Sequence, residues 1–127
     1  IGQVIGGGTP STKEETYYGG DVPWITPKDL SNYDYICIDK GKRNITKLGL
    51  KKSSAKLMPS GTVLFSSRAP IGYVAIAKND ISTNQGFKSI ICDESLVDNR
   101  FIFYSLKFYK NANRYRKNQC LAPQFNP

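Results

Sequence analysis

Residues 57–91 read LMPSGTVLFSSRAPIGYVAIAKNDISTNQGFKSII, and this stretch decides the fold. It holds the apolar runs Thr62–Phe65 and Tyr73–Ala77, and a third run, Gly86–Cys92, overlaps its end; Ser, Pro, Gly and Asn separate them. Short continuous apolar runs with such punctuation are typical of strands buried on both faces. We therefore predict three strands of one sheet, with connections that display Arg68, Asn84 and Gln85. As isolated triplets, SSR and NQG are also ordinary turn chemistry.

Shorter elements are predicted on both sides of this stretch. Trp24, the single tryptophan, is expected to anchor the core rather than stack on a base. A long helix is predicted at 98–113, and it is expected to be buried on more than one side because its apolar residues form no single stripe. The pattern predicts strands at Gln3–Ile5, Val22–Thr26 and Tyr35–Asp39, a helical turn after Thr26, a short helix at Asn44–Ser53, and a long helix at Asp98–Asn113 with Asp98 as its N-cap.

Composition excludes several classes of function. The chain has 127 residues, enough for one domain with a single core. It has no His, which removes the usual general base and the Ser-His-Asp and Cys-His systems. Three scattered cysteines argue against a zinc site and a disulfide framework, and favour a reducing compartment such as the cytoplasm. No apolar run approaches the length of a membrane span. We therefore expect no catalytic residue, no cofactor and no metal.

Charge is distributed unevenly along the chain. The net charge is +8, yet residues 40–127 hold 16 of the 18 Lys and Arg and only four of the ten acids. Two segments without acids, Lys40–Lys56 and Lys107–Lys117, contain most of these cations. Two basic clusters on one small domain indicate a polyanion partner such as nucleic acid. The same composition is also typical of a solubilising surface.

Four phrases in one order carry more information than any single motif. They are GGTPST at 7–12, YYGGDVPWITPKDL at 17–30, ITKLGLKKSSAKLMPSGTVLFSSRAPIGYVAIA at 45–77 and TNQGFKSI at 83–90. Together they resemble a target-recognition domain of the specificity subunit of type I restriction-modification enzymes. The resemblance covers roughly residues 4–110.

The resemblance implies a mixed α/β fold with a twisted, partly barrel-like sheet and a few short helices. It implies a non-catalytic reader of one half of a split DNA target. Its partners would be double-stranded DNA, an adenine-methylating modification subunit, a restriction subunit, and a second copy or a second recognition domain. We expect one domain over residues 1–127, with its core at about 3–113 and a tail at 114–127. Such subunits continue into a heptad-bearing spacer helix, which is expected to be absent because this tail shows no heptad repeat.

Residues that read bases are expected mainly outside the shared phrases, at 31–44 and 107–119, because family members read different sequences. Lys and Arg would neutralise phosphates, while Arg, Lys, Asn and Gln can read base edges. The expected DNA-binding residues are Asn32, Tyr33, Tyr35, Lys42, Arg43, Asn44, Lys47, Lys51, Lys52, Arg68, Lys88, Lys110, Arg114, Arg116 and Lys117.

The sequence is also compatible with two other functions. The chain could be a protein-interaction module of the same system that no longer reads DNA, and an exposed apolar patch along Phe101–Phe108 would favour this. It could also be a small nuclease, against which the missing His and the lack of clustered acids weigh.

Overall fold

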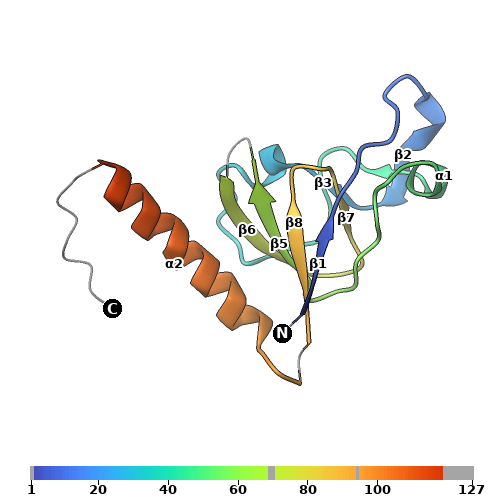
Figure 1. The fold of residues 1–127 in the computed structure, drawn as a ribbon. Coiled ribbons are helices and arrows are strands. Elements are labelled where there is room, and N and C mark those ends of the chain that lie inside the picture. The colour runs from blue at the N-terminus through green and yellow to red at the C-terminus, as the bar shows by residue number, and fades with distance from the viewer. Residues whose placement is uncertain (1, 69–70, 94, 119–127) are drawn as a thin grey trace.

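The computed structural model describes residues 2–68, 71–93 and 95–118. Within these ranges a five-stranded sheet lies beside a two-stranded sheet, with one short and one long α-helix (Figure 1). The larger sheet has the order β1-β8-β5-β6-β4, formed by Gly2–Gly6, Lys88–Cys92, Val63–Ser67, Ile71–Ala77 and Cys37–Ile38. The smaller sheet pairs β3 (Trp24–Ile25) with β7 (Ser82–Thr83) in parallel. The predicted mixed α/β fold is confirmed.

The remaining elements lie around these sheets. They are the 3₁₀ turns η1 (Glu15–Tyr17) and η2 (Pro27–Leu30), strand β2 (Tyr18–Val22), and helices α1 (Lys47–Lys51) and α2 (Asn99–Asn118). In the part of the chain that the structure describes, neither helix is long and apolar enough to cross a membrane.

The central strands are buried on both faces, as their continuous apolar runs predict. Leu64 of β5 pairs with Ala75 of β6, and both belong to the core cluster that also contains Phe87. Val63, the preceding residue, pairs with Ile76 and lies in the cluster on the other face. Successive side chains of a strand point to opposite faces, so one strand contributes to two cores.

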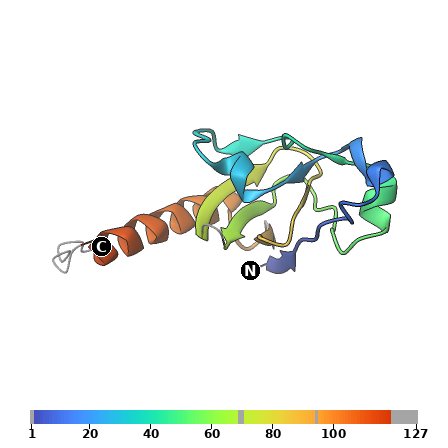
Figure 2. The ribbon, with the colours of Figure 1, turned by 90° about the horizontal axis from the view of Figure 1, so that it is seen from above.

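Helix α2 covers one face of the sheet and then leads away from it (Figures 1 and 2). Phe103 is 1% exposed and packs on β5 and β6, while the side chain of Asp98 accepts a hydrogen bond from Arg100 N at 2.8 Å. The predicted helix end at Asn113 was wrong, because the helix continues to Asn118 and takes in the first residues of the predicted tail.

The prediction that α2 is buried on more than one side was also wrong. Phe101, Tyr104 and Phe108 are 64%, 55% and 52% exposed. At spacings of three and four residues these side chains share one helix face. Phe103 lies against the sheet, whereas this aromatic face is turned outward.

Helix α1 is shorter than the predicted Asn44–Ser53. Ile45 is fully buried and forms isolated bridges with β2, so the chain is still extended there. The helix begins after Thr46, whose hydroxyl accepts a hydrogen bond from Gly49 N at 3.0 Å. A Cβ at Gly49 would lie 2.5 Å from Tyr17 O, so close contact with η1 requires glycine there.

Candidate nucleic-acid interface

A basic loop at residues 40–44 is held by the carboxylate of Asp29. One oxygen of this carboxylate accepts from Lys42 N at 3.0 Å, and the other accepts from Thr26 N at 2.8 Å. The predicted turn after Thr26 is therefore confirmed as η2, and its acidic residue also fixes the loop. Lys42 and Arg43 remain exposed.

Asn44 closes the same loop from inside. Its side-chain oxygen accepts hydrogen bonds from Gly41 N at 3.1 Å and from Trp24 N at 3.2 Å. A Cβ on Gly41 would lie 2.1 Å from Trp24 O, so the loop backbone is pressed against β3. Asn44 was predicted among the base readers, but the structure gives its oxygen a structural role. Trp24 is buried, and its indole N–H donates to Gly8 O at 3.0 Å, which confirms it as a core anchor.

Arg43 is fixed through an aromatic ring. Its guanidinium carbon lies 3.9 Å from the ring centroid of Tyr18, a cation–π contact. Tyr18 is held in turn, because its hydroxyl donates to Pro10 O at 2.6 Å. The charged group most suited to bidentate recognition is thus held in place before any ligand arrives.

The lysines of α1 continue this basic surface. Lys47 and Lys51 of this helix are exposed, as are Lys52 directly after it and Lys56 in the next loop. No acidic residue occurs anywhere between Lys40 and Lys56. A mobile lysine ammonium is a point charge that suits phosphate rather than base edges.

A pair of tyrosines borders the segment before β4. The hydroxyl of Tyr33 donates to Cys37 O, and burial, followed by the nearby Asp39 carboxylate, raises the pKa of Tyr33 above its usual value. Its ring meets that of Tyr35 edge to face, with centroids 5.5 Å apart. Tyr33 is therefore held by the fold, whereas Tyr35 is 74% exposed. Asn32 is exposed and has a positive φ of 61°, as expected at a tight turn.

The other predicted contacts do not join the basic loop. Lys88 is exposed on β8, where it pairs with Gly6 of β1. The side chains of Lys110, Arg114, Arg116 and Lys117 lie outside the described residues. Their helix backbone leads away from the sheet at the end opposite α1 (Figures 1 and 2). The described backbone therefore separates the two basic segments instead of bringing them together.

Arg68 lies in a hollow that sequence reasoning did not predict. This open hollow, about 490 Å³ in volume, is lined by Thr26, Pro27, Lys28, Arg68, Asn84, Gln85 and Gly86. The Arg68 guanidinium donates to Gln85 O at 3.3 Å. The three predicted polar residues of the strand connections do meet, but Lys28 was missed. Its only signal was its position directly after the Thr-Pro start of a turn.

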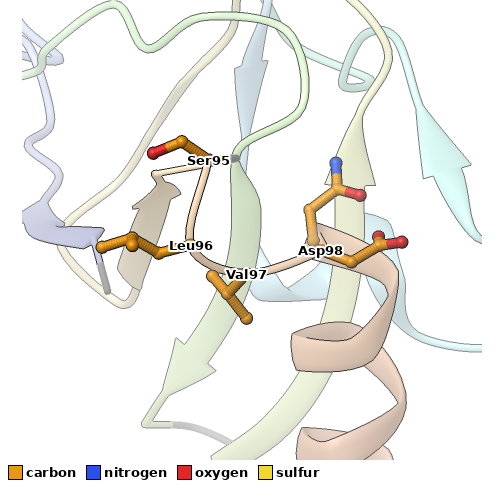
Figure 3. Close-up of a pocket in the computed structure, with 5 residues that line it drawn as sticks. Ser95, Leu96, Val97 and Asp98 are labelled. Carbon is orange, nitrogen blue, oxygen red and sulfur yellow. The ribbon is translucent and has the colours of Figure 1, made fainter.

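A second hollow of about 380 Å³ lies where β8 leads into α2, and Figure 3 shows it formed by one loop. Two of its polar side chains already have hydrogen-bond partners. The Asp98 carboxylate accepts from Arg100 N at the start of α2, and Asn99 Nδ2 donates to Gly61 O at 3.0 Å. Among the described residues, no three His, Cys, Asp or Glu side chains are grouped to hold a metal ion.

Comparisons with known proteins identify relatives of this chain. The chain is 55% identical over 117 residues to the MjaIX type I restriction enzyme specificity subunit of Methanocaldococcus jannaschii, a match that covers 92% of this chain and 27% of that protein. It is 34% identical over 107 residues to the HindI specificity subunit of Haemophilus influenzae, covering 84% of this chain and 23% of that protein. The chain thus spans about a quarter of the length of these relatives.

The fold has solved counterparts. The crystal structure of the HsdS subunit from Thermoanaerobacter tengcongensis superimposes with a TM-score of 0.62 at 22% identity, over 84% of this chain and 25% of that one. Residues 1–126 match the family described as the type I restriction modification DNA specificity domain. With this match and the relative at 55% identity, the chain belongs to the type I restriction-modification DNA specificity domain family.

Proposed function

We propose that this domain reads one half of a bipartite DNA target for a type I restriction-modification system, without catalytic activity of its own. It would direct a modification subunit that methylates adenine and a restriction subunit that cuts DNA. The observation that carries this proposal is the basic loop, in which Asp29, Asn44 and Tyr18 fix Lys42 and Arg43 before DNA binds. Family membership supports the same assignment.

Phosphate and base contacts would be divided along this surface. The lysines of α1 would supply sequence-independent affinity, which falls as salt rises because counterions are released from the DNA. Arg43, with its planar fork of donors, is the residue in the fixed loop best suited to a guanine edge. Tyr35 and Asn32 are exposed and are further candidates for base contact.

The test is selection from a randomised duplex pool at two salt concentrations about fourfold apart. Enrichment of one short motif, with affinity that falls steeply with salt, is expected. Arg43→Lys keeps the charge and loses the fork, so it should bind duplex nearly as tightly but select the motif less sharply. Salt-sensitive binding without any enrichment by the wild-type domain would contradict sequence reading.

The exposed aromatic face of α2 favours a second candidate, a protein-interaction module of the same system. Phe101, Tyr104 and Phe108 form a stripe on a helix that leads away from the core. Large exposed apolar faces often mark interaction sites. The proposed partner is the modification subunit. The triple variant with Ser at these positions loses the ring contact of Tyr104 with Phe103. It should remain folded and should lose co-elution with that subunit. Retained co-elution would exclude this face as the contact.

A further inference from the structure

The hollow beside Arg68 brings cations and side-chain amides together. It contains two exposed cations, Lys28 and Arg68, and two side-chain amides, Asn84 and Gln85, with no acidic residue. These residues come from three places in the chain: η2, the end of β5 and the link between β7 and β8. Their convergence is a product of the fold, not of a local basic run.

Acceptor atoms of this lining are already occupied. The side-chain oxygen of Asn84 accepts from Gly86 N at 2.9 Å. Because a backbone N–H can only donate, this bond fixes the oxygen end of Asn84 and leaves its Nδ2 as the donor end. The backbone oxygen of Gln85 accepts from the Arg68 guanidinium, and its side-chain oxygen contacts the hydroxyl of Thr9.

The donors that remain are the rest of the guanidinium, the lysine ammonium and the amide NH₂ groups. Such a set suits a ligand that accepts hydrogen bonds and carries negative charge. A phosphate suits it better than a base edge, because the phosphate carries negative charge and base edges are neutral. The hollow is also open, so it can take a group that stays attached to a chain.

We propose that this hollow binds a backbone phosphate of duplex DNA, with Lys28 and Arg68 supplying charge and Asn84 a neutral donor. The assignment rests on the proposed function. It gives the domain a second anchor next to the basic loop, because the carboxylate of Asp29 bonds both Thr26 N at the hollow and Lys42 N in the loop. A phosphate held there fixes the register of the strand whose bases face the loop.

Three variants with the same change in net charge test the assignment. Asn84→Asp keeps the oxygen that accepts from Gly86 N but replaces the donor end by a negative charge. Arg68→Gln removes the guanidinium charge. Lys78→Gln is the matched control, because Lys78 is exposed and follows β6 at the end opposite Arg68. Each is measured as the full 127-residue chain against a random-sequence duplex over a range of salt.

Asn84→Asp and Arg68→Gln are expected to weaken duplex binding by roughly tenfold, and Arg68→Gln to lower the salt slope by about one. Lys78→Gln should stay within about twofold of wild type, since its charge is remote and screened. If the wild-type domain binds duplex and all three variants behave alike, the hollow is not a DNA contact.

Titration with inorganic phosphate at constant ionic strength separates the free ion from DNA. Saturable shifts of the Gln85 and Gly86 amide resonances are expected in wild type and in Lys78→Gln, and their loss in Asn84→Asp. Shifts with phosphate alone, without any selective loss of duplex affinity, would overturn the DNA assignment. Absence of shifts in wild type would overturn the anion site. A wild-type domain that binds no duplex would instead refute the proposed function.

Discussion

Replacing Asn44 by Ala is expected to destabilise the domain by about 2 kcal/mol. The side-chain oxygen accepts from Gly41 N at 3.1 Å and from Trp24 N at 3.2 Å, and both bonds are partly buried. Truncation leaves both N–H groups without this acceptor. A donor that loses its partner in a partly buried place costs about 1 kcal/mol, near the lower end of the range for buried groups. Two such donors give the stated loss.

The matched variant Asn44→Asp separates this role from base reading. A carboxylate oxygen can accept from the same two N–H groups, and the neighbouring cations of the loop favour its negative charge. Its free energy of unfolding should fall less than that of the alanine variant, because both N–H groups keep an acceptor although the new charge lies on the loop that the Asp29 carboxylate also holds. The alanine variant is therefore expected to unfold at a lower temperature and a lower denaturant concentration than the aspartate variant.

Thermal and denaturant unfolding measure both variants. For a domain of this size, 2 kcal/mol corresponds to a fall in the midpoint of roughly 8 °C. The reasoning fails if Asn44→Ala unfolds with the wild-type midpoint but loses its preference for one DNA motif. That result would return Asn44 to the base readers.

The remaining predictions concern the core and the tyrosines. Phe103→Ala should cost about 3 to 5 kcal/mol in unfolding experiments, since this 1% exposed ring joins α2 to the sheet; a loss under about 1 kcal/mol would mean that the helix is not docked. Gly49→Ala should destabilise despite the higher helix propensity of Ala, because the added Cβ would lie 2.5 Å from Tyr17 O, and a stabilised variant would disprove that contact. Tyr33 should titrate above the usual tyrosine pKa, since burial is the largest cause of its shift. Its contribution to stability is complete below the unfolded pKa and is lost as pH rises through the folded value. In an ultraviolet titration of the tyrosines, wild type should show an ionisation at high pH that the Tyr33→Phe variant lacks. Identical curves for the two proteins would contradict the raised pKa.

The central strands could be predicted because their signal is local. Val63 and Leu64 are both buried, on opposite faces, so burial leaves a continuous apolar run in the sequence. Strand β2 could not be predicted in the same way, since Gly19 and Gly20 are typical turn residues. Gly20 is glycine because a Cβ there would lie 2.6 Å from Thr46 Cα, a contact made by a distant segment.

The sequence indicates which residue types could contact DNA, but it does not show which of these side chains hold the fold instead. Exposed cations follow from charge patterning, and the structure keeps Lys42 and Arg43 exposed. Whether an Asn reads a base or holds a loop depends on which backbone N–H groups the fold brings to it, and sequence contains no such information. The side-chain oxygen of Asn44 accepts from Trp24 N, and that of Asn84 accepts from Gly86 N.

The Asp29 carboxylate holds the basic loop through backbone hydrogen bonds and, among the described residues, does not pair with the loop's cationic side chains. Both of its oxygens accept from backbone N–H groups, Thr26 N on one side and Lys42 N on the other. The charge of the carboxylate is therefore directed at peptide donors, while the lysine side chain of the loop stays exposed. Asp29→Asn should keep one oxygen acceptor and lose the other, so the loop or the η2 turn, but not both, would be released. Because the same residue joins the hollow to the basic loop, its substitution should weaken duplex binding more than the loss of a single hydrogen bond implies, even though it removes a negative charge. Tighter binding by Asp29→Asn would mean that charge, and not the fixed geometry of the loop, controls affinity.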